Sequence, residues 1–169
     1  MLTAQEVINL LQLEPLPHEG GFFHQTYRSP ETIPAAALPA RYEQERVLGT
    51  AIYFLLTPID FSAMHRLDTA EIYHFYYGDP LEMLLLHPAG SGELFLLGNN
   101  LGEGQRPQKV VERDVWQGTR LAPGGQHGFA LIGTTMAPGF EWVGFELGER
   151  DTLVQQYPDF GDMIAARVR

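Results

Sequence analysis

The chain of 169 residues contains no cysteine, few positive charges and no long apolar run. Without cysteine it can form no disulfide framework, no thiolate-ligated zinc or iron–sulfur site, and no thiol nucleophile. Its 11 Lys and Arg face 21 Asp and Glu, which gives a formal net charge of −10. Because clustered cations bind phosphate backbones, we expect neither nucleic acid nor an anionic membrane as a partner.

The hydrophobic stretches are also short. No segment approaches the ~18 uninterrupted apolar residues of a transmembrane helix. Residues 1–13 lack the basic start and the small-residue cleavage site of a secretory signal. We therefore expect a soluble cytoplasmic protein. A chain of this length can bury about 70% of its unfolded surface around one core, so we expect a single domain over residues 1–169.

Turn-forming and aromatic residues are plentiful, with 18 Gly, 12 Pro, 10 Phe and 7 Tyr. This composition favours many short strands over a helical bundle. A short helix capped at Thr3 and a C-terminal helical tail from Asp151 flank the predicted strands. Residues 29–46 read as a loop. The predicted fold is an all-β antiparallel sandwich or small barrel, with strands at 22–28, 47–56, 62–65, 71–77, 82–87, 93–97, 108–111, 115–121, 127–136 and 141–147.

The most informative stretch for chemistry joins two of these strands. His65 ends one predicted strand and Glu71 begins the next, so that two metal ligands or an acid–base pair can converge across a tight turn. Strand alternation places Glu71, Tyr73 and Phe75 on one face and His74 on the other. We therefore assign His74 to packing and the first face, if it is inward, to a site.

The spacing of these residues resembles a known pattern. A His, a Glu and a closing Gly at His65, Glu71 and Gly78 resemble the first conserved motif of the cupins, with Leu67 in place of the motif's second His. Segment 118–127 resembles the second cupin motif and ends on a histidine, His127.

A wider resemblance covers nearly the whole chain and points to the cupin-5 group (DUF985). It implies a double-stranded β-helix, the cupin or jelly-roll barrel, usually dimeric, with a pocket inside the barrel and no settled reaction. We accordingly expect a homodimer, in which the strand at 22–28 could add to a partner's sheet. The segments that carry the resemblance are 17–28, 50–56, 64–66, 71–82 and 137–140.

The resemblance also raises the possibility of a divalent metal, because cupin sites hold Fe, Mn, Ni or Zn with imidazoles and a carboxylate. Here His65, Glu71 and His127 could supply two imidazoles and one carboxylate. The alternative is that His65 and Glu71 hydrogen-bond each other and no cofactor is bound. Glu19, beside a glycine pair, either lines the same pocket or belongs to a tight turn.

Candidate ligand-binding residues follow from the scarcity of cations and from the motifs. Arg28 and Arg66 could each bind a carboxylate or phosphate through a bidentate guanidinium, or could pair with one of the many acids. Trp116 and Gln117, just before the second motif, are predicted to wall the pocket, and Phe75 to stack against a ligand.

These residues are consistent with three classes of function: an enzyme, with or without a metal, a non-catalytic binding module and a structural dimer. In an isomerase- or epimerase-type enzyme for a sugar- or carboxylate-like metabolite, His65 would abstract a proton next to a carbonyl, Glu71 would orient it, and Tyr53 or Tyr73 would act as the acid. A metal-dependent enzyme would use an open coordination position instead. The alternatives to an enzyme are a non-catalytic small-molecule binding module and a structural dimer whose own side chains fill the pocket.

Overall fold

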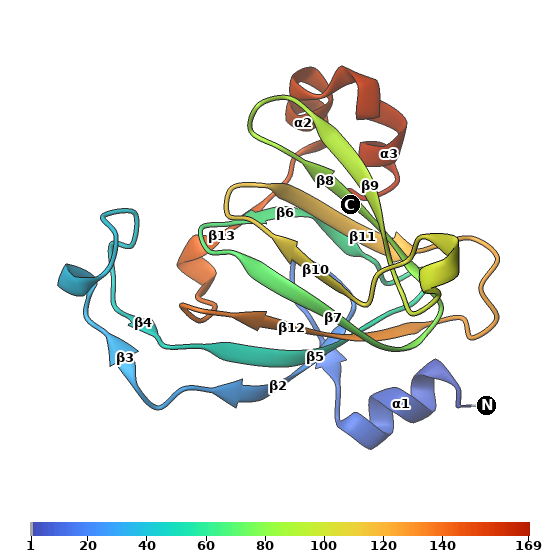
Figure 1. The fold of residues 1–169 in the computed structure, drawn as a ribbon, viewed down its shortest axis with the longest axis horizontal. Helices are drawn as coiled ribbons and strands as arrows, with labels where there is room; N and C mark the ends of the chain where they lie inside the picture. Colours follow the sequence, from blue (N-terminus) through green and yellow to red (C-terminus); the bar gives the residue numbers. More distant parts are fainter. Residues whose placement is uncertain (1) are drawn as a thin grey trace.

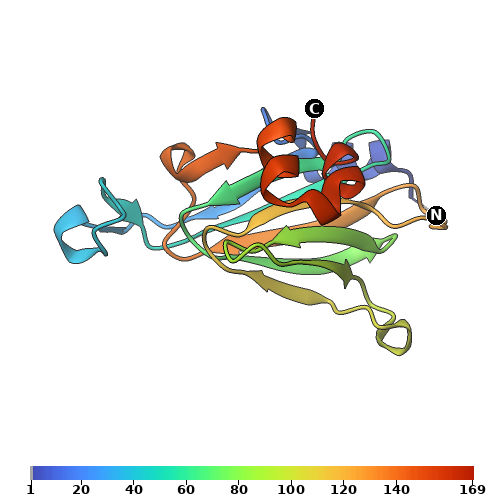
Figure 2. The ribbon, with the colours of Figure 1, turned by 90° about the horizontal axis from the view of Figure 1, so that it is seen from above.

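Two β-sheets face each other and form a barrel in the computed structural model, which describes residues 2–169 (Figures 1 and 2). One sheet has six strands in the order β1-β2-β5-β12-β7-β10, and the other has five in the order β13-β6-β11-β8-β9. The double-stranded β-helix is thereby confirmed. Within the described residues no helix is long and apolar enough to span a lipid bilayer.

The strand boundaries agree closely with the pattern of turn residues. The six-stranded sheet contains β1 (Glu14–Pro15), β2 (Phe22–Arg28), β5 (Thr50–Leu56), β12 (Ala130–Met136), β7 (Glu71–Gly78) and β10 (Gln108–Val111). The five-stranded sheet contains β13 (Phe145–Leu147), β6 (Ser62–Leu67), β11 (Trp116–Leu121), β8 (Leu81–Leu86) and β9 (Gly92–Leu97).

The inward face of β7 shows how alternation positions the site. Glu71, Tyr73 and Phe75 are buried, as the two-residue period predicts. The pairing of β7 with β12 then shifts register between Phe75 and Tyr77, which is a β-bulge. Tyr77 is therefore exposed, although strict alternation from Glu71 would place it on the buried face of β7.

The barrel interior is filled by apolar side chains from both sheets. At one side, Lys109 of β10 donates to Glu93 of β9 at 2.6 Å, which joins the edges of the two sheets. The buried members of this core are Phe54, Leu56, Tyr73, Phe75, Leu81, Met83, Leu85, Leu97, Val111, Val115, Ala130 and Ile132.

Helices pack on part of the outer face of each sheet. The N-terminal helix α1 (Ala4–Leu11) begins with the predicted capping box at Thr3 and packs on β5 of the six-stranded sheet. The C-terminal helices α2 (Arg150–Gln156) and α3 (Gly161–Ala165) lie against the five-stranded sheet, beside β8 in Figure 1.

The segment predicted as a loop before the main barrel contains a small hairpin. Strands β3 (Thr32–Ile33) and β4 (Arg46–Val47) pair with each other and project away from the barrel, with a short 3-10 turn, η1 (Ala35–Ala37), at the tip (Figures 1 and 2). Strand β2, which could have added to a partner's sheet, instead pairs with β5 of its own chain.

The packing of the C-terminal helices predicts a stability effect. Leu153 of α2 is fully buried against Met64, Leu84 and Trp116, so we expect Leu153→Ala to lower the free energy of unfolding by about 2–5 kcal/mol. Leu10→Ala, at a mostly exposed position of α1, is the matched control, and we expect it to change stability little. Urea denaturation of both variants measures the difference; equal midpoints would contradict the packing of α2 on this sheet.

Candidate active site

Three strands bring the polar residues of the candidate site together inside the barrel. His65 comes from β6, Glu71 from β7 and Gln117 from β11, and all three side chains are buried. Gln117 lies directly opposite His65 in the ladder between β11 and β6. The sheets therefore fix these side chains through backbone register, on rigid elements rather than on loops.

Hydrogen bonds determine the tautomer of His65. Nδ1 lies 2.8 Å from the carbonyl oxygen of Ala63, which can only accept, so Nδ1 carries the hydrogen. Nε2 lies 3.1 Å from the side-chain nitrogen of Gln117 and accepts its hydrogen bond. The same Gln117 nitrogen donates to Glu71 Oε2 at 2.8 Å. The amide thus links a neutral imidazole to a carboxyl group.

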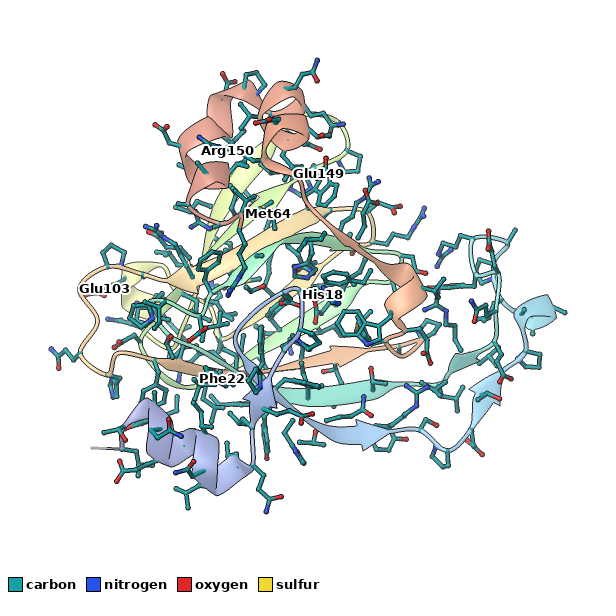
Figure 3. The ribbon with its side chains drawn as sticks, turned by 180° about the vertical axis from the view of Figure 1, so that it is seen from behind. His18, Phe22, Met64, Glu103, Glu149 and Arg150 are labelled. Atoms are coloured by element: carbon teal, nitrogen blue, oxygen red, sulfur yellow. The ribbon has the colours of Figure 1, made fainter. Side chains whose placement is uncertain are left out.

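A second carboxyl group, Glu19, enters the barrel from the turn between β1 and β2. His18, Gly20 and Gly21 have positive φ angles of 66°, 98° and 76°, and a Cβ at Gly20 would lie 2.6 Å from the carbonyl oxygen of Phe61. Only glycine fits such a close backbone approach. Figure 3 shows this turn, which includes His18, between the two sheets.

Contacts with β6 hold Glu19 in place. Its carbonyl oxygen accepts from the backbone N–H of Ala63 at 2.9 Å, and its Oε1 accepts from the hydroxyl of Ser62 at 2.6 Å. Its Oε2 lies 4.0 Å from Nε2 of His65. The strained turn therefore delivers a carboxyl group beside the buried imidazole.

Burial shifts the proton affinities of all three groups. It raises the pKa of Glu19 to about 7, against the opposing hydrogen bond from Ser62. Burial and then the charge of Glu19 raise the pKa of Glu71, whereas His65, Thr134 and Gln117 act to lower it. Burial lowers the pKa of His65, which keeps the imidazole neutral. Burial therefore favours the protonated form of both carboxyl groups, and each opposes the ionisation of the other.

A cavity of about 180 Å³ opens onto these groups. Glu19, His65 and Glu71 line it together with polar Gln25, Thr50 and Thr134. Its mouth is flanked by Arg28 and Glu141, which form an ion pair. The remaining lining is apolar and comes from Leu16, Phe23, Ile52, Leu67, Met136, Phe140 and Trp142.

The two tyrosines proposed as acids do not reach this cavity. Tyr73 is buried behind Glu71, and burial, the charges of Glu71 and Glu19 and a hydrogen bond with Glu71 hold the pKa of its phenol well above the usual range. It therefore orients Glu71 rather than donating to a ligand. Tyr53 lies on the outer face of the sheet, edge-on to Tyr76, because its register partner is Gly133 and the inward neighbour is Phe54.

Only some of the predicted ligand-binding residues lie at or next to the cavity. Arg28 lies at the cavity mouth, whereas Gln117 does not line the cavity but bonds His65 and Glu71, which do. Arg66 and Trp116 point outward from β6 and β11, where the guanidinium lies 4.7 Å from the indole ring and pairs with a glutamate, Glu146. Their places next to His65 and Gln117 in sequence put them on the opposite face. Phe75 belongs to the apolar core away from the cavity.

The structure does not bring His127 to His65 and Glu71. Glu71 begins β7, whereas His127 packs beside Asp79, just past the other end of that strand. The length of β7 separates the two places by about 23 Å. The three-ligand metal site predicted from sequence spacing is therefore not formed, because the second motif closes a loop around Asp79 instead of pointing into the barrel.

The donor atoms near His65 do not fit a metal either. Its Nε2 lone pair accepts from Gln117, and Leu67 occupies the position of a second imidazole. Across residues 2–169 no three His, Cys, Asp or Glu side chains converge as a metal-binding group. We derive no chemical step through a metal.

The sequence pattern did not predict every residue of the candidate site. It allowed Glu19 either to line the pocket or to belong to a tight turn, and in the structure Glu19 does both. Ser62, which binds Glu19, and Thr134, which acts on Glu71, carry no motif of their own. Inward alternation on β12 is the signal that could have found Thr134. Ser62 lies three residues from His65 and faces inward only because the pairing of β6 with β11 shifts register there, which the sequence does not signal. Trp142, in a short 3-10 segment, has no such signal.

The family relationship follows from comparison with known proteins. Residues 5–148 match the family described as Cupin superfamily (DUF985), so the chain belongs to this family of cupins. An uncharacterized protein of Saccharomyces cerevisiae is 32% identical over 148 residues, which cover 83% of this chain and 72% of that protein.

Solved structures agree with this assignment. A crystal structure of a Shewanella oneidensis protein is 32% identical, with a TM-score of 0.87 and coverage of 100% of this chain and 99% of that chain. A hypothetical protein from Leishmania major is 28% identical, with the same TM-score and 99% coverage of each chain. Oxalate decarboxylase of Bacillus subtilis, at 10% identity and TM-score 0.53, shares the fold over 92% of this chain and 37% of its own.

The raised pKa of Glu19 predicts a pH-dependent stability. Above the ordinary value of 4.5 the unfolded chain releases the proton, while the folded chain keeps it until about pH 7. Native stability therefore falls as pH rises through this window. We expect Glu19→Gln to become more stable than the parent by up to about 3 kcal/mol at pH 8, with no such gain at pH 4. Urea denaturation across this pH range measures it, and the exposed Glu43→Gln variant should show a flat difference.

Proposed function

We propose that the barrel cavity binds a small polar metabolite and catalyses proton transfer at a carbon next to a carbonyl group, as isomerases and epimerases do. The observation that carries this proposal is the convergence of Glu19, Glu71 and His65 on one cavity inside an otherwise apolar barrel. Buried titratable groups with shifted proton affinity are typical of active sites.

The carboxyl pair supplies both halves of the reaction. In its ionised form Glu19 takes the proton from carbon, since its Oε2 faces the cavity and has no assigned hydrogen-bond partner among residues 2–169. The electron pair of the broken C–H bond forms a C=C bond and the π pair of the carbonyl moves to its oxygen, which accepts a hydrogen bond from the carboxyl group of the pair that is protonated. Return of the proton to either face or to the neighbouring carbon completes the isomerisation. His65, whose Nε2 accepts from Gln117 and lies 4.0 Å from Glu19 Oε2, stays neutral and positions the substrate beside the carboxyl pair.

The cavity also restricts the substrate class. A volume of about 180 Å³ is below the ~300–1,000 Å³ of pockets for drug-sized ligands, so the substrate is a small metabolite. Arg28 lies at the mouth and is paired with Glu141. Its guanidinium can bind one carboxylate of a substrate in place of Glu141. Phe140 and Trp142 provide an apolar wall for the carbon skeleton.

A non-catalytic binding module is the second candidate. It is favoured by the hydrogen bond from Gln117 to His65, which already engages the imidazole lone pair. In that case the same cavity would hold its ligand without proton transfer.

Hydrogen exchange in D2O distinguishes the two. We expect the protein to exchange the α-hydrogen of a small α-hydroxy ketone or keto acid within a metabolite panel, observed as loss of the proton NMR signal. Glu19→Gln should slow exchange about a hundredfold or more, because it removes the acid–base group. Glu43→Gln should exchange like the parent.

Other results are equally informative. Thermal stabilisation by a panel member without exchange would favour the binding module over the enzyme. A His65→Ala variant that keeps both full ligand affinity and full exchange would overturn both candidates, since His65 lines the cavity that both candidates use.

We also propose that two copies of the chain associate through the outer face of the six-stranded sheet. The outward positions of β5, β12, β7 and β10 include Ile72, His74, Tyr76, Val110 and Thr135, and none of these strands directs an Asp, Glu, Lys or Arg outward there. At a net charge of −10 two copies repel each other, so an uncharged face is where they can approach.

A charge placed on this face should separate the copies. We expect light scattering to give twice the 18.9 kDa chain mass for the parent. Val110→Glu should give the single-chain mass, because it puts like charges opposite each other in the interface. The control Ile59→Glu changes an 81% exposed side chain elsewhere and should leave the dimer intact. A monomeric parent would contradict the association.

A further inference from the structure

A second, larger cavity lies at the other end of the barrel from Glu71. It has a volume of about 670 Å³, in the range of ligand-binding pockets. Three connections between strands form it: the β7–β8 turn, residues 98–107 between β9 and β10, and residues 122–129 between β11 and β12. It shares no lining residue with the barrel cavity and takes no part in the proposed proton transfer.

One buried carboxylate organises this end of the barrel. Asp79 accepts from the backbone N–H groups of Gln126 at 2.7 Å, His127 at 2.9 Å and Gly128 at 2.7 Å. A Cβ at Gly125 would lie 2.2 Å from the Asp79 carboxyl carbon, so only glycine allows the loop to approach. The glycine-rich part of the second cupin-like motif therefore builds a rigid loop rather than a metal site.

The same carboxylate orients His127. Nδ1 of His127 donates to Asp79 Oδ1 at 3.1 Å, and the ring stands edge-on to Tyr77 at 5.0 Å and to Phe129 at 6.3 Å. Nε2 has no assigned partner within residues 2–169 and the residue lines the cavity. The imidazole of His127, with its free Nε2, and the exposed ring of Tyr77 therefore lie side by side in the cavity lining.

The remaining lining is rich in amides and contains no cation. Neither Lys nor Arg lines the cavity, and the carboxylates of Glu82 and Glu103 do. The side chains of Asn99, Asn100 and Gln126 have no assigned hydrogen bond within the described chain. The carboxylate of Glu82 is paired with Arg120 and Arg167, which leaves the amides and Glu103 uncommitted. Aromatic faces with uncommitted amides match the alternating C–H faces and hydroxyl groups of a carbohydrate.

We propose that this second cavity binds a neutral saccharide. Tyr77 supplies the surface that stacks on the sugar ring, while Asn100, Gln126 and His127 hydrogen-bond its hydroxyls. Anionic ligands are disfavoured, because Asp79, Glu82 and Glu103 gather there without a cation in the lining.

Saturation-transfer NMR on the full chain tests this proposal with maltose, cellobiose and lactose at millimolar concentration, and with gluconate as an anionic comparison. We expect at least one neutral disaccharide to bind and gluconate not to bind. Amide shifts of the 15N-labelled protein should change in segments 98–107 and 122–129. The double variant Asn100→Ala, Gln126→Ala should weaken binding about tenfold or more, because it removes two hydrogen-bonding amides.

The matched control is Gln155→Ala, Gln156→Ala, which removes two exposed amides from α2 and should bind the disaccharide like the parent. Glu19→Gln should also bind it unchanged, which separates this site from the barrel cavity. Absence of binding by all three disaccharides, equal binding of gluconate, or amide shifts confined to the residues around His65 would each overturn the proposal.

Discussion

The arrangement of the barrel interior depends on one buried amide. Both polar hydrogens of the Gln117 nitrogen are directed at acceptors, His65 Nε2 and Glu71 Oε2, on two different strands. An acceptor left unpaired inside a protein costs about 1–3 kcal/mol, so the amide favours a neutral imidazole and a carboxyl group that presents an oxygen. The side-chain carbonyl oxygen of Gln117 is buried without a hydrogen-bond partner. The two hydrogen bonds of the nitrogen offset the free energy lost there.

Glu19 is held less tightly than His65, Glu71 and Gln117. It is bound by one hydroxyl, from Ser62, and its second oxygen faces the cavity. Two neighbouring carboxyl groups beside a neutral imidazole make double ionisation unfavourable. This balance supports the acid–base chemistry proposed for the cavity.

Turn residues and strand alternation were sufficient to predict the strands, and alternation placed Glu71, Tyr73 and Phe75 on one face of β7 without showing that this face points inward. The outward positions of Arg66 and Trp116 follow from the same alternation, because they adjoin His65 and Gln117 in sequence. The prediction failed where the decisive information is three-dimensional. His127 matched a motif, but Asp79 captures the loop that carries it, a contact between residues 48 positions apart. Glu19 depends on a left-handed turn whose direction no local pattern specifies.

The C-terminal helices and the barrel interior differ in how strictly the structure constrains the residue type at each position. The family match ends at residue 148, before α2 begins, yet Leu153, Tyr157 and Ile164 cover the outside of the strands that carry His65 and Gln117. Covering a sheet requires apolar volume rather than particular side chains. Substitutions among apolar residues in this tail therefore preserve the site, while the hydrogen-bonded interior tolerates almost none. The two parts of one chain can consequently diverge at different rates.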